Sequence, residues 1–459
     1  MGELKDRRVV VLGMARQGKA LAQFLSSRGA HVTMSDLKSP EALVEVREEL
    51  AHLPLEYALG GHPSNLLEGT SMLFLSGGVP PDIPIVKEGL EHGIELSNDS
   101  QLFMELCPAP VIGITGSAGK STTTALAGVI AEEEFRGSGR TVWTGGNLGR
   151  PLLLDLDSIQ PDDWAVLELS SFQLELMNES PKVAAVLNIT PNHLDRHKTM
   201  EAYTEAKARI LRFQSADDIA VLGKDDPGAW AMKDLVHGKL LTFGMSNEGI
   251  ESGAYVRNGS IWLRIEDRER EVLAVDHIPI PGLHNVMNAV AACAIAAGAG
   301  FSIEAMQSGI PRFKGLPHRL EFVKSVAGVD WFNDSIATSP ERAMAAMTAF
   351  DRPIVLLAGG RDKDLPWKDF IRMVQVRVDH LILFGEAAEK IQSKLNDLPQ
   401  AEKPFSVDLC GGLEEAVEVA FRVAEPGDVV LLAPGGTSFD EFIDFAARGE
   451  RFVELVEEL

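Results

Sequence analysis

The sequence predicts an α/β protein with largely parallel sheets, divided into more than one domain. Short aliphatic strands alternate with helical stretches along the whole chain, which is typical of sheets built from strand–helix–strand units. Many of these strands end in glycine-containing turns. The 459 residues also exceed what one core usually supports, because single cores rarely grow beyond about 250 residues.

Three blocks of this alternation follow one another. The first opens with a strand expected at 7–13 and closes at the breaker-rich segment 107–110. The second ends after a helix expected over 284–300, and the third follows the Pro- and Gly-containing stretch 309–319. In the third block we expect strands in PIVLLAG, HLILFG and DVVLLAP. The three predicted domains span residues 1–109, 110–311 and 312–459.

One segment of the middle block departs from the strand–helix alternation. Residues 244–277 alternate apolar and polar side chains and contain the pair Asn258-Gly259. An Asn-Gly pair adopts the positive φ angles that a two-residue hairpin turn needs. We therefore expect an antiparallel hairpin in this segment.

Charge and cysteine content exclude several classes of protein. The net charge of −24 argues against a nucleic-acid or anionic-membrane surface, because such surfaces are basic. The three cysteines lie far apart and have no C-x-x-C spacing, so they indicate neither a zinc site nor a disulfide framework. No signal-peptide core and no apolar run of membrane-spanning length is present. We expect a cytoplasmic protein without a membrane segment or a nucleic-acid partner.

The first glycine-containing turn lies between Gly13 and Gly18, after the strand expected at 7–13. Asp36 ends the next expected strand, so the pattern resembles a dinucleotide-binding turn, in which the later acid accepts a ribose hydroxyl. Ala15 takes the place of the second glycine, which normally lets a pyrophosphate approach the backbone. Two interpretations stay open: a plain strand-to-helix turn, or a nucleotide diphosphate bound less intimately than NAD.

The second glycine-containing turn reads Thr115-Gly-Ser-Ala-Gly-Lys-Ser121 between an expected strand and an Ala-rich helix. The strict G-x-x-x-x-G-K-[ST] pattern is not met, because Ile114 stands at the first glycine position. The physical requirements are met all the same. Glycines let backbone N–H groups converge on phosphate oxygens, Lys120 supplies a positive charge, and Ser121 can reach a magnesium ion. We predict phosphate binding at this turn.

Three further side chains are candidates for the same site, each with an ordinary structural alternative. Glu168 ends an expected buried strand, where a carboxylate is costly unless it binds a metal or pairs with Lys or Arg. His193 lies in a strand-end loop, but a lone histidine is more often a hydrogen-bonded structural residue. Lys207 lies on an expected helix near Glu201 and Glu205, where a solvated lysine is the ordinary interpretation.

Taken together, the motifs carry a family resemblance. The strings TGSAGKST, ELSSFQLE, NITPNHLDRH with YTEAKARI, HNVMNAVAA, LPHRLE and NDSIATS occur in this order and resemble those of the Mur ligase family. The resemblance covers essentially the whole chain. It implies a Rossmann-like N-terminal domain that binds a UDP-sugar, a P-loop-type central ATPase domain, and a Rossmann-like C-terminal domain that binds an amino acid.

The resemblance also implies a reaction. The motifs are most similar to those of ligases that use ATP to add D-glutamate to UDP-N-acetylmuramoyl-L-alanine through an acyl phosphate. That reaction is a cytoplasmic step of peptidoglycan precursor synthesis. A sibling ligase that adds a different amino acid is the alternative. The implied partners are small molecules, namely ATP, D-glutamate and the UDP-sugar substrate, and we expect a monomer.

Individual roles follow from the resemblance, residue by residue. The implied catalytic residues are Lys120, Glu168, His193 and Lys207. Lys207 would be carried as a carbamate, which replaces its interpretation as a solvated lysine. Contacts to ATP are implied for Gly116, Ser117, Gly119, Lys120, Ser121, Thr122, Asn285, Arg319 and Asp334. Two Mg²⁺ ions are implied at Ser121, Glu168, His193 and Lys207. The UDP-substrate would contact Ala15, Arg16, Asp36, Ser76, Gly77 and Asn147, and the amino acid Thr338, Lys363, Ser438 and Phe445.

One position departs from the family pattern. Where the family usually reads Asn-Asp-Ser-Lys-Ala-Thr, this chain has Ile336 in place of the lysine. An amine near the acceptor or the transferred phosphate is therefore missing, unless Arg342 or Arg361 supplies a positive charge. The departure affects amino-acid recognition more than the class of reaction.

Two alternatives lie outside the ligases. An NAD-dependent oxidoreductase built on the first glycine turn would leave the second turn unexplained. A non-catalytic nucleotide-binding regulator would require Glu168, His193 and Lys207 to occur together by chance.

Overall fold

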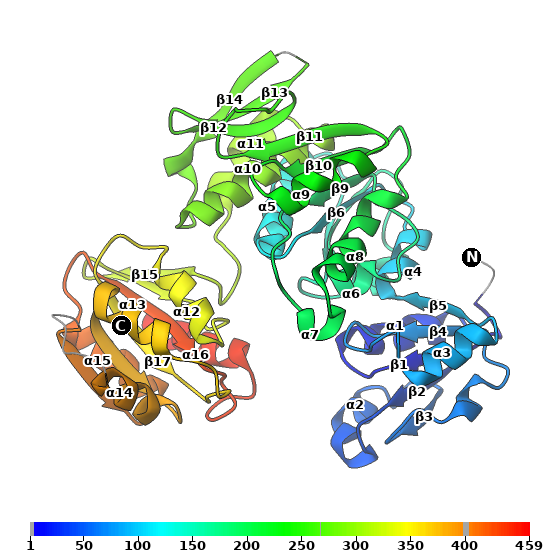
Figure 1. The fold of residues 1–459 in the computed structure, drawn as a ribbon, viewed down its shortest axis with the longest axis horizontal. Helices are drawn as coiled ribbons and strands as arrows, with labels where there is room; N and C mark the ends of the chain where they lie inside the picture. Colours follow the sequence, from blue (N-terminus) through cyan, green and yellow to red (C-terminus); the bar gives the residue numbers. More distant parts are fainter. Residues whose placement is uncertain (1–3, 267, 398–403) are drawn as a thin grey trace. The chain divides into compact units, whose positions relative to one another are not determined.

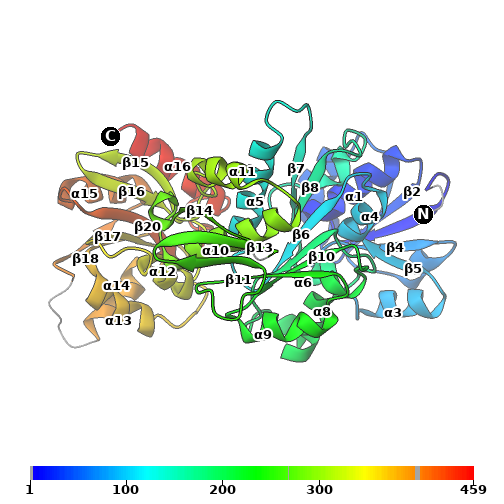
Figure 2. The ribbon, with the colours of Figure 1, turned by 90° about the horizontal axis from the view of Figure 1, so that it is seen from above.

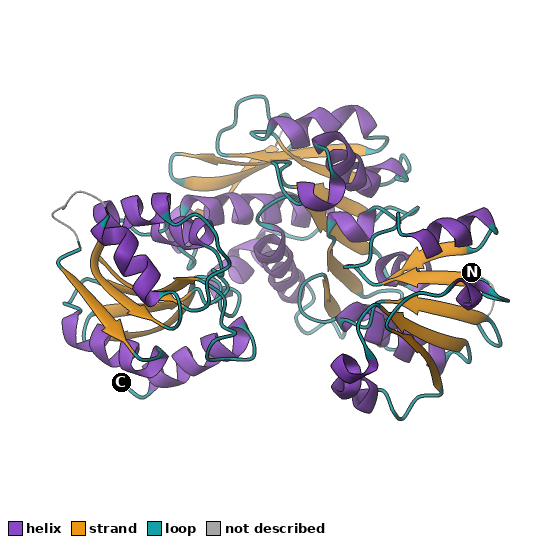
Figure 3. Cartoon of the chain, turned by 60° about the horizontal axis from the view of Figure 1, so that its bottom comes forward, coloured by secondary structure: helices purple, strands orange, loops and turns teal. Residues whose placement is uncertain are grey.

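The computed structural model describes residues 4–266, 268–397 and 404–459, and within these residues the strands form three sheets (Figure 1). The chain divides into two compact units. The first unit comprises Met1–His277 and Met287–Pro311 and holds two sheets; the second comprises Ile278–Val286 and Arg312–Leu459 and holds the third. Helices cover mostly parallel strands (Figure 3), so the predicted α/β class is confirmed.

The first sheet is parallel throughout its described strands, in the order β3-β2-β1-β4-β5. Strand β1 is buried along almost its whole length, as expected for a parallel strand covered on both faces. The strands are β1 (Arg8–Leu12), β2 (His31–Asp36), β3 (Leu55–Leu59), β4 (Met72–Leu75) and β5 (Glu95–Asn98). The helices are α1 (Arg16–Ser27), α2 (Val44–Glu49), α3 (Pro84–Glu91) and α4 (Asp99–Leu106).

The second sheet runs in the order β14-β13-β12-β11-β10-β9-β6-β8-β7 among the described residues. Its parallel strands are β6 (Val111–Thr115), β7 (Val142–Gly146), β8 (Trp164–Glu168), β9 (Val183–Val186), β10 (Ile219–Gly223) and β11 (Lys239–Gly244). Its helices are α5 (Lys120–Glu134), α6 (Ser171–Leu174), α7 (Leu194–His197), α8 (Met200–Arg212), α9 (Pro227–Trp230), α10 (Leu283–Gly298) and α11 (Ile303–Gly309). Because β6 lies between β8 and β9, the glycine turn after β6 lies beside the carboxyl ends of both neighbours.

The second sheet is extended by β12 (Gly253–Arg257), β13 (Ser260–Ile265) and β14 (Arg268–Ala274) (Figure 1). Strand β12 pairs parallel with β11, and β13 pairs antiparallel with both β12 and β14. Asn258 and Gly259 connect β12 to β13 with φ angles of 51° and 76°. Both angles are positive, as a two-residue hairpin turn requires. The hairpin predicted within residues 244–277 is confirmed.

The third sheet has the order β15-β16-β20-β17-β18-β19, and β15 is antiparallel to β16. Helices α12 to α14 pack on one face of β17 through Ile354 and Leu356, and α15 and α16 pack on the other through Val355 and Leu357 (Figure 2). This alternation follows from the two-residue period of a strand. The strands are β15 (Glu321–Val326), β16 (Val329–Asn333), β17 (Ile354–Gly359), β18 (Val378–Phe384), β19 (Ser406–Cys410) and β20 (Val429–Gly435). The helices are α12 (Pro340–Met347), α13 (Lys368–Arg377), α14 (Ala388–Asn396), α15 (Leu413–Val423) and α16 (Phe445–Glu457).

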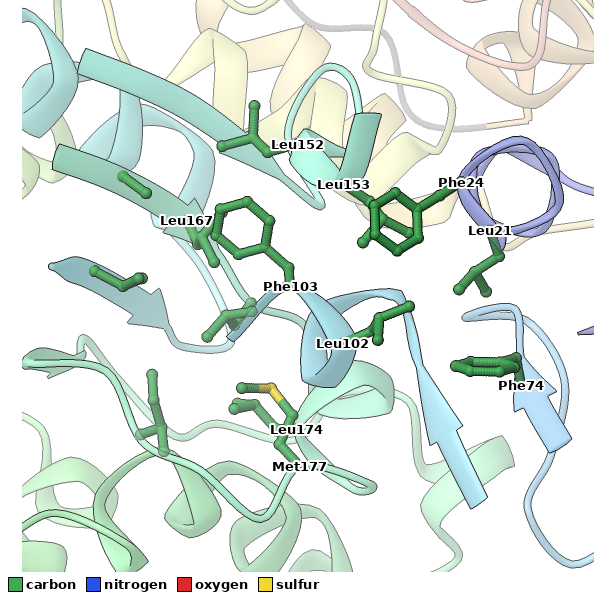
Figure 4. Close-up of a cluster of buried hydrophobic side chains, with 14 of the residues drawn as sticks. Leu21, Phe24, Phe74, Leu102, Phe103, Leu152, Leu153, Leu167, Leu174 and Met177 are labelled. Atoms are coloured by element: carbon green, nitrogen blue, oxygen red, sulfur yellow. The ribbon is translucent and has the colours of Figure 1, made fainter. Parts of the chain in front are cut away.

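A single hydrophobic cluster joins the first two sheets (Figure 4). Leu102 and Phe103 of α4 lie at its centre, with Phe24 of α1 on one side and Leu167 of β8 on the other. Since burial of apolar surface is the main force that holds elements together, this shared core explains why both sheets belong to one compact unit.

Among the described residues, no helix combines the length and the apolar character needed to span a membrane.

Candidate active site

The glycine turn after β6 forms a preshaped cradle at the N-terminus of α5. Gly119 is the N-cap of α5 with φ +80°, a conformation that favours glycine. A Cβ atom at this position would lie 2.4 Å from Asn288 Oδ1. The Asn188 side chain holds the turn from the other side, because it accepts a hydrogen bond from Ala118 N at 2.8 Å and donates one to Ala118 O at 3.1 Å. Backbone N–H groups at the start of a 15-residue helix favour an anion at this point.

Two lysines converge on this turn from different helices. Lys120 Nζ donates to Gly116 O at 3.0 Å and to Ser117 O at 3.2 Å. Lys207 Nζ, from α8, donates to the same Gly116 O at 2.8 Å and to Thr115 Oγ1 at 3.2 Å. The two lysines thus share one backbone carbonyl oxygen of the turn, that of Gly116.

Lys207 is buried, with 1% of its surface exposed, so its interpretation as a solvated lysine is wrong. Burial, and then the neighbouring Lys120 charge, hold the pKa of Lys207 well below its ordinary value, although Glu168 acts in the opposite direction. The structure therefore favours a neutral amine at Lys207. A signal for this burial is present in the sequence, because Tyr203, Lys207 and Leu211 recur at four-residue intervals on one face of a helix.

Glu168 is also buried, with 2% of its surface exposed, at the end of β8 next to the turn. Its Oε1 accepts a hydrogen bond from Asn147 Nδ2 at 2.9 Å, whereas Oε2 has no hydrogen-bond partner. The hydrogen-bonding partner is thus an amide rather than the Lys or Arg considered as the structural alternative. A buried carboxylate oxygen without a partner is costly, and it has the chemistry of an unused cation ligand.

His193 lies in the loop before α7, where it is the N-cap residue with φ +53°. Its ring packs edge-to-face against Phe172 at 5.1 Å between centroids. Among the described residues, no group of three His, Cys, Asp or Glu side chains is placed to hold a metal ion. Mg²⁺ rarely needs such a cage, since it commonly combines one or two carboxylates with phosphate oxygens and water. The unpartnered oxygen of Glu168 beside a phosphate-binding turn fits this preference of Mg²⁺ for a carboxylate together with phosphate oxygens.

Ser121 and Thr122 lie in the first turn of α5, directly after Lys120. Ser117 lies in the same turn, where its Oγ is 2.9 Å from Tyr203 Oη and donates to Thr190 O at 2.9 Å. Tyr203 therefore belongs to the same cluster, although the sequence did not single it out.

The first glycine turn contacts the second sheet through Arg16. Its guanidinium donates to Asn147 O at 3.0 Å and also to Gly149 O. Asn147 thus links the two turns, because its side chain binds Glu168 while its carbonyl accepts from Arg16. The side chains predicted for the UDP-substrate and for the metal meet at this residue.

Asp36 has a structural role at the first turn. Its Oδ2 accepts from Met14 N and its Oδ1 from Lys38 N, both at 2.9 Å. The structure adds a cavity of about 400 Å³ beside Asp36. The lining residues are Gly13, Asp36, Leu37, His62, Gly78, Val79, Pro80, Ile83, Pro84 and Ile85.

The other residues predicted for the UDP-substrate lie near this turn. Ala15 is the N-cap of α1. Ser76 is buried after β4, and its N–H donates to Leu12 O at 2.9 Å. Gly77 N donates to the Gln17 side chain at 3.0 Å.

Three residues predicted to contact ATP belong to the second unit. Asn285 lies in the first turn of α10 and donates to Pro281 O at 2.6 Å. Asp334 accepts from Leu320 N at 3.0 Å, and its burial raises its pKa to about 6 although Arg319 and Arg342 lower it. The Asp334 carboxyl is therefore more easily protonated than an ordinary aspartate, and once protonated it can donate a hydrogen bond.

The residues predicted for the amino acid lie in the second unit, where a buried arginine ties together segments near Thr338, Ser438 and Phe445. Arg448, with none of its surface exposed, donates to Ser335 O at 2.9 Å and to Gly436 O at 3.3 Å. Ser335 in turn donates to Phe445 O at 2.8 Å. The loops that carry Thr338 and Ser438 thus share one anchor, which no sequence signal indicated. Lys363 is exposed in the loop after β17.

The structure distinguishes the two cations considered near Ile336. Arg342 donates to Ile336 O at 3.4 Å. Arg361 forms a bidentate salt bridge with Glu386, in which Nε donates to Oε2 and Nη2 donates to Oε1, both at 2.9 Å. Arg342 is therefore the arginine next to the position of the missing lysine.

Comparison with known proteins gives matches along nearly the whole chain. The family described as "Mur ligase MurD-like, N-terminal domain" matches residues 7–98, "Mur ligase middle domain" matches 114–296, and "Mur ligase, glutamate ligase domain" matches 318–436. A UDP-N-acetylmuramoylalanine--D-glutamate ligase of Caldanaerobacter subterraneus subsp. tengcongensis is 40% identical over 458 residues, covering 100% of this chain and 99% of that protein. The Symbiobacterium thermophilum protein of the same name is 40% identical over 455 residues, covering 99% and 98%.

Solved structures show the same fold at low sequence identity. The UDP-N-acetylmuramate-alanine ligase MurC of Thermotoga maritima superposes with a TM-score of 0.59 at 18% identity, covering 98% of this chain and 99% of that one.

Proposed function

The chain belongs to the Mur ligase family, and we infer that it catalyses the ATP-dependent ligation of D-glutamate to UDP-N-acetylmuramoyl-L-alanine, with release of ADP. This reaction is a step of peptidoglycan precursor synthesis. Among the structural observations, the buried and unpartnered Glu168 oxygen beside a lysine-rich phosphate turn supports it best.

The protein uses ATP and Mg²⁺, and the phosphate turn offers the groups for both. In the proposal, Gly116, Ser117, Gly119, Lys120, Ser121 and Thr122 bind the phosphates. Glu168 and Ser121 would hold one Mg²⁺, and His193 and Lys207 a second. Bound Mg²⁺ would offset negative charge on the phosphates. Asn285, Arg319 and Asp334 are the further residues proposed to contact the nucleotide.

Lys207 is proposed to act as a carbamate. A buried lysine with a lowered pKa presents a neutral amine, which can attack CO₂: a nitrogen–carbon bond forms and one proton leaves. The product is an anion, which the positive charge of Lys120 would attract. It would also repel Glu168 unless a cation lies between them, which is why the carbamate and Mg²⁺ belong to the same proposal.

The proposed chemistry takes place in two steps. The carboxylate of UDP-N-acetylmuramoyl-L-alanine attacks the γ-phosphorus of ATP, the bond to the β–γ bridging oxygen breaks, ADP leaves, and an acyl phosphate is formed. The amine of D-glutamate then attacks the acyl carbon, phosphate leaves, and the nitrogen loses a proton as the amide forms. Lys120 would stabilise the transferred phosphoryl group. His193, in the loop before α7, is the candidate for the base in that step, a role that is open to it only when it does not hold the second Mg²⁺.

Substrate contacts are proposed at two further places. Ala15, Arg16, Asp36, Ser76, Gly77 and Asn147 would hold the UDP-substrate, with the cavity beside Asp36 as its nucleotide end. Thr338, Lys363, Ser438 and Phe445 would hold D-glutamate, with Arg342 supplying the positive charge that Ile336 lacks.

The domain division is kept as a proposal: a UDP-sugar-binding domain at 1–109, an ATP-binding domain at 110–311 and an amino-acid-binding domain at 312–459. The separate sheets within 8–98, 111–274 and 321–435 support it. The monomeric state and the cytoplasmic location stay predictions.

Release of ADP by the purified protein tests the function directly. The assay contains ATP, Mg²⁺ and UDP-N-acetylmuramoyl-L-alanine, and it compares D-glutamate with a panel of other amino acids. We expect release that depends on D-glutamate. Release only with another amino acid would make the protein a sibling ligase, and no release with any of them would contradict the ligase function.

A further inference from the structure

The cavity beside the first glycine turn has an almost entirely apolar wall of glycines, prolines and aliphatic side chains. Two polar side chains line it, Asp36 and His62. Both oxygens of Asp36 already accept backbone N–H groups. His62 is therefore the polar side chain of this wall that the glycine turn itself does not use, and in a largely apolar pocket one such group decides orientation and specificity.

The hydrogen bonds around His62 fix which of its ring nitrogens carries a proton. Ser35 Oγ lies 2.7 Å from His62 Nδ1 and 3.2 Å from Gly61 O. A serine hydroxyl has one proton to donate. The assignment that makes both contacts hydrogen bonds has Nδ1–H donating to Ser35 Oγ and Ser35 donating to Gly61 O. His62 Nε2 then has no proton and is an acceptor.

The charge state of His62 agrees with this assignment. Burial lowers the pKa of His62, and this effect exceeds the opposite effect of the Asp36 carboxylate. The ring is therefore neutral at pH 7, and a neutral imidazole has one donor and one acceptor nitrogen.

We propose that His62 selects the nucleobase of the substrate, by accepting the N3–H of uracil at Nε2. The inference rests on the proposed UDP-substrate and assigns a residue that reads its base. Uracil carries a proton on N3, whereas cytosine has a lone pair there. An unprotonated Nε2 therefore attracts the first base and repels the second. A hydrogen bond of this kind gives roughly a 10-fold preference for uracil. The repulsion between His62 Nε2 and the lone pair on cytosine N3 increases that preference.

Binding measurements on the full chain test the proposal. Isothermal titration calorimetry would compare UDP, CDP and N3-methyl-UDP with the wild type, with His62→Ala and with His92→Ala. His92 is an exposed histidine of the same sheet domain and serves as the matched control. We expect the wild type and His92→Ala to bind UDP about 10-fold or more tighter than the other two ligands. In His62→Ala, UDP should lose about that factor, and the three affinities should converge.

The outcomes separate the two proposals. If His62→Ala keeps the preference of the wild type for UDP over CDP, His62 does not read the base and the inference is wrong. If the wild type binds none of the three nucleotides, the proposed UDP-substrate fails, and the role of His62 fails with it. D-glutamate-dependent ligation of the UDP-linked substrate together with an unchanged preference in His62→Ala would overturn the inference alone.

A second measurement does not depend on the His62→Ala variant being folded. Nitrogen NMR of the histidine side chains distinguishes an unprotonated Nε2 from a protonated one in the free wild-type protein. We expect the form with Nδ1–H for His62. In Ser35→Ala, which removes the partner that fixes this form, the preference for UDP over CDP should decrease. A wild-type His62 protonated on Nε2 would contradict the proposal.

Discussion

The two glycine turns of the first unit have the same backbone architecture, but the charged side chains beside them differ in whether the protein itself satisfies them. In each, a buried parallel strand enters a glycine turn and a helix begins directly after it, at Arg16 or at Lys120. At the first turn the carboxylate of Asp36 is satisfied by two backbone N–H groups. At the second, Lys207 and Glu168 are buried with neutral partners, and one Glu168 oxygen has none.

The difference shows what glycine spacing does and does not specify. Glycine spacing specifies a tight turn between a strand and a helix, and both regions have such a turn. The ligand chemistry comes from side chains that other elements bring to the turn: His62 from the loop after β3, and Glu168 and Lys207 from β8 and α8. At the first turn both carboxylate oxygens of Asp36 have partners, whereas the second contains a buried Glu168 oxygen that a bound cation would satisfy.

Changing Lys207 or Lys120 to Ala should produce the largest effect, and only at the second turn. We expect ligation to fall by about 10³-fold or more, because each change removes a group that faces the developing charge. Binding of UDP to the first turn should stay unchanged. ADP release and calorimetry with UDP measure the two properties separately.

Lys239→Ala, at an exposed position of β11, is the control for these variants. Added short carboxylates such as acetate should partly restore the activity of Lys207→Ala, since they would replace the carbamate anion. Near-normal turnover of Lys207→Ala without any addition would show that the carbamate assignment is wrong.

Glu168→Gln should lower ligation by about 10²- to 10³-fold while leaving the unliganded fold intact. Glutamine keeps the oxygen that accepts from Asn147 and removes a buried charge whose second oxygen has no partner. The thermal midpoint of the nucleotide-free protein should therefore not decrease. A clear decrease, measured by calorimetry without ATP or Mg²⁺, would mean that Glu168 is a structural residue like Asp36.

Asp99→Asn should change how stability depends on pH. Asp99 lies in α4 between the two turns, and burial raises its pKa to about 6 from 3.8. Between these values the folded state binds more protons than the unfolded state, so stability falls as pH rises from about 4 to 6, by on the order of 3 kcal/mol.

Urea unfolding of Asp99→Asn at pH 4 to 7 measures this effect. The variant should lack this decrease, whereas Glu91→Gln, at an exposed position of α3, should keep it. The same decrease in Asp99→Asn would show that another group is responsible.

Asp36→Asn should give the smallest effect, a loss of about 1 kcal/mol in the free energy of unfolding. Asparagine can accept from one of the two N–H groups, of Met14 and Lys38, but presents its NH₂ group to the other. Urea unfolding of the nucleotide-free protein measures the loss. Full stability together with lost UDP affinity would indicate that Asp36 serves the ligand rather than the turn.

Local pattern was sufficient for much of the fold. The strands at β1, β6, β17, β18 and β20, the helix α10 and the hairpin at Asn258 and Gly259 follow from apolar runs, helical period and turn chemistry. Strands β15, β16 and β19 were not predicted. Much of β15 and β19 is only half buried, so their apolar pattern is weak.

The sequence by itself determined the α/β class, the two glycine turns and the ordered motifs of a Mur ligase, because each depends on residues close together in the chain. Only the tertiary structure decided the state of the side chains at those turns. Lys207 is buried because α8 packs it against Thr115 and Gly116, and Asp36 accepts from Met14 because β1 and β2 are paired. Burial and hydrogen bonding between distant segments determine charge state, and neither is encoded in the spacing of a motif.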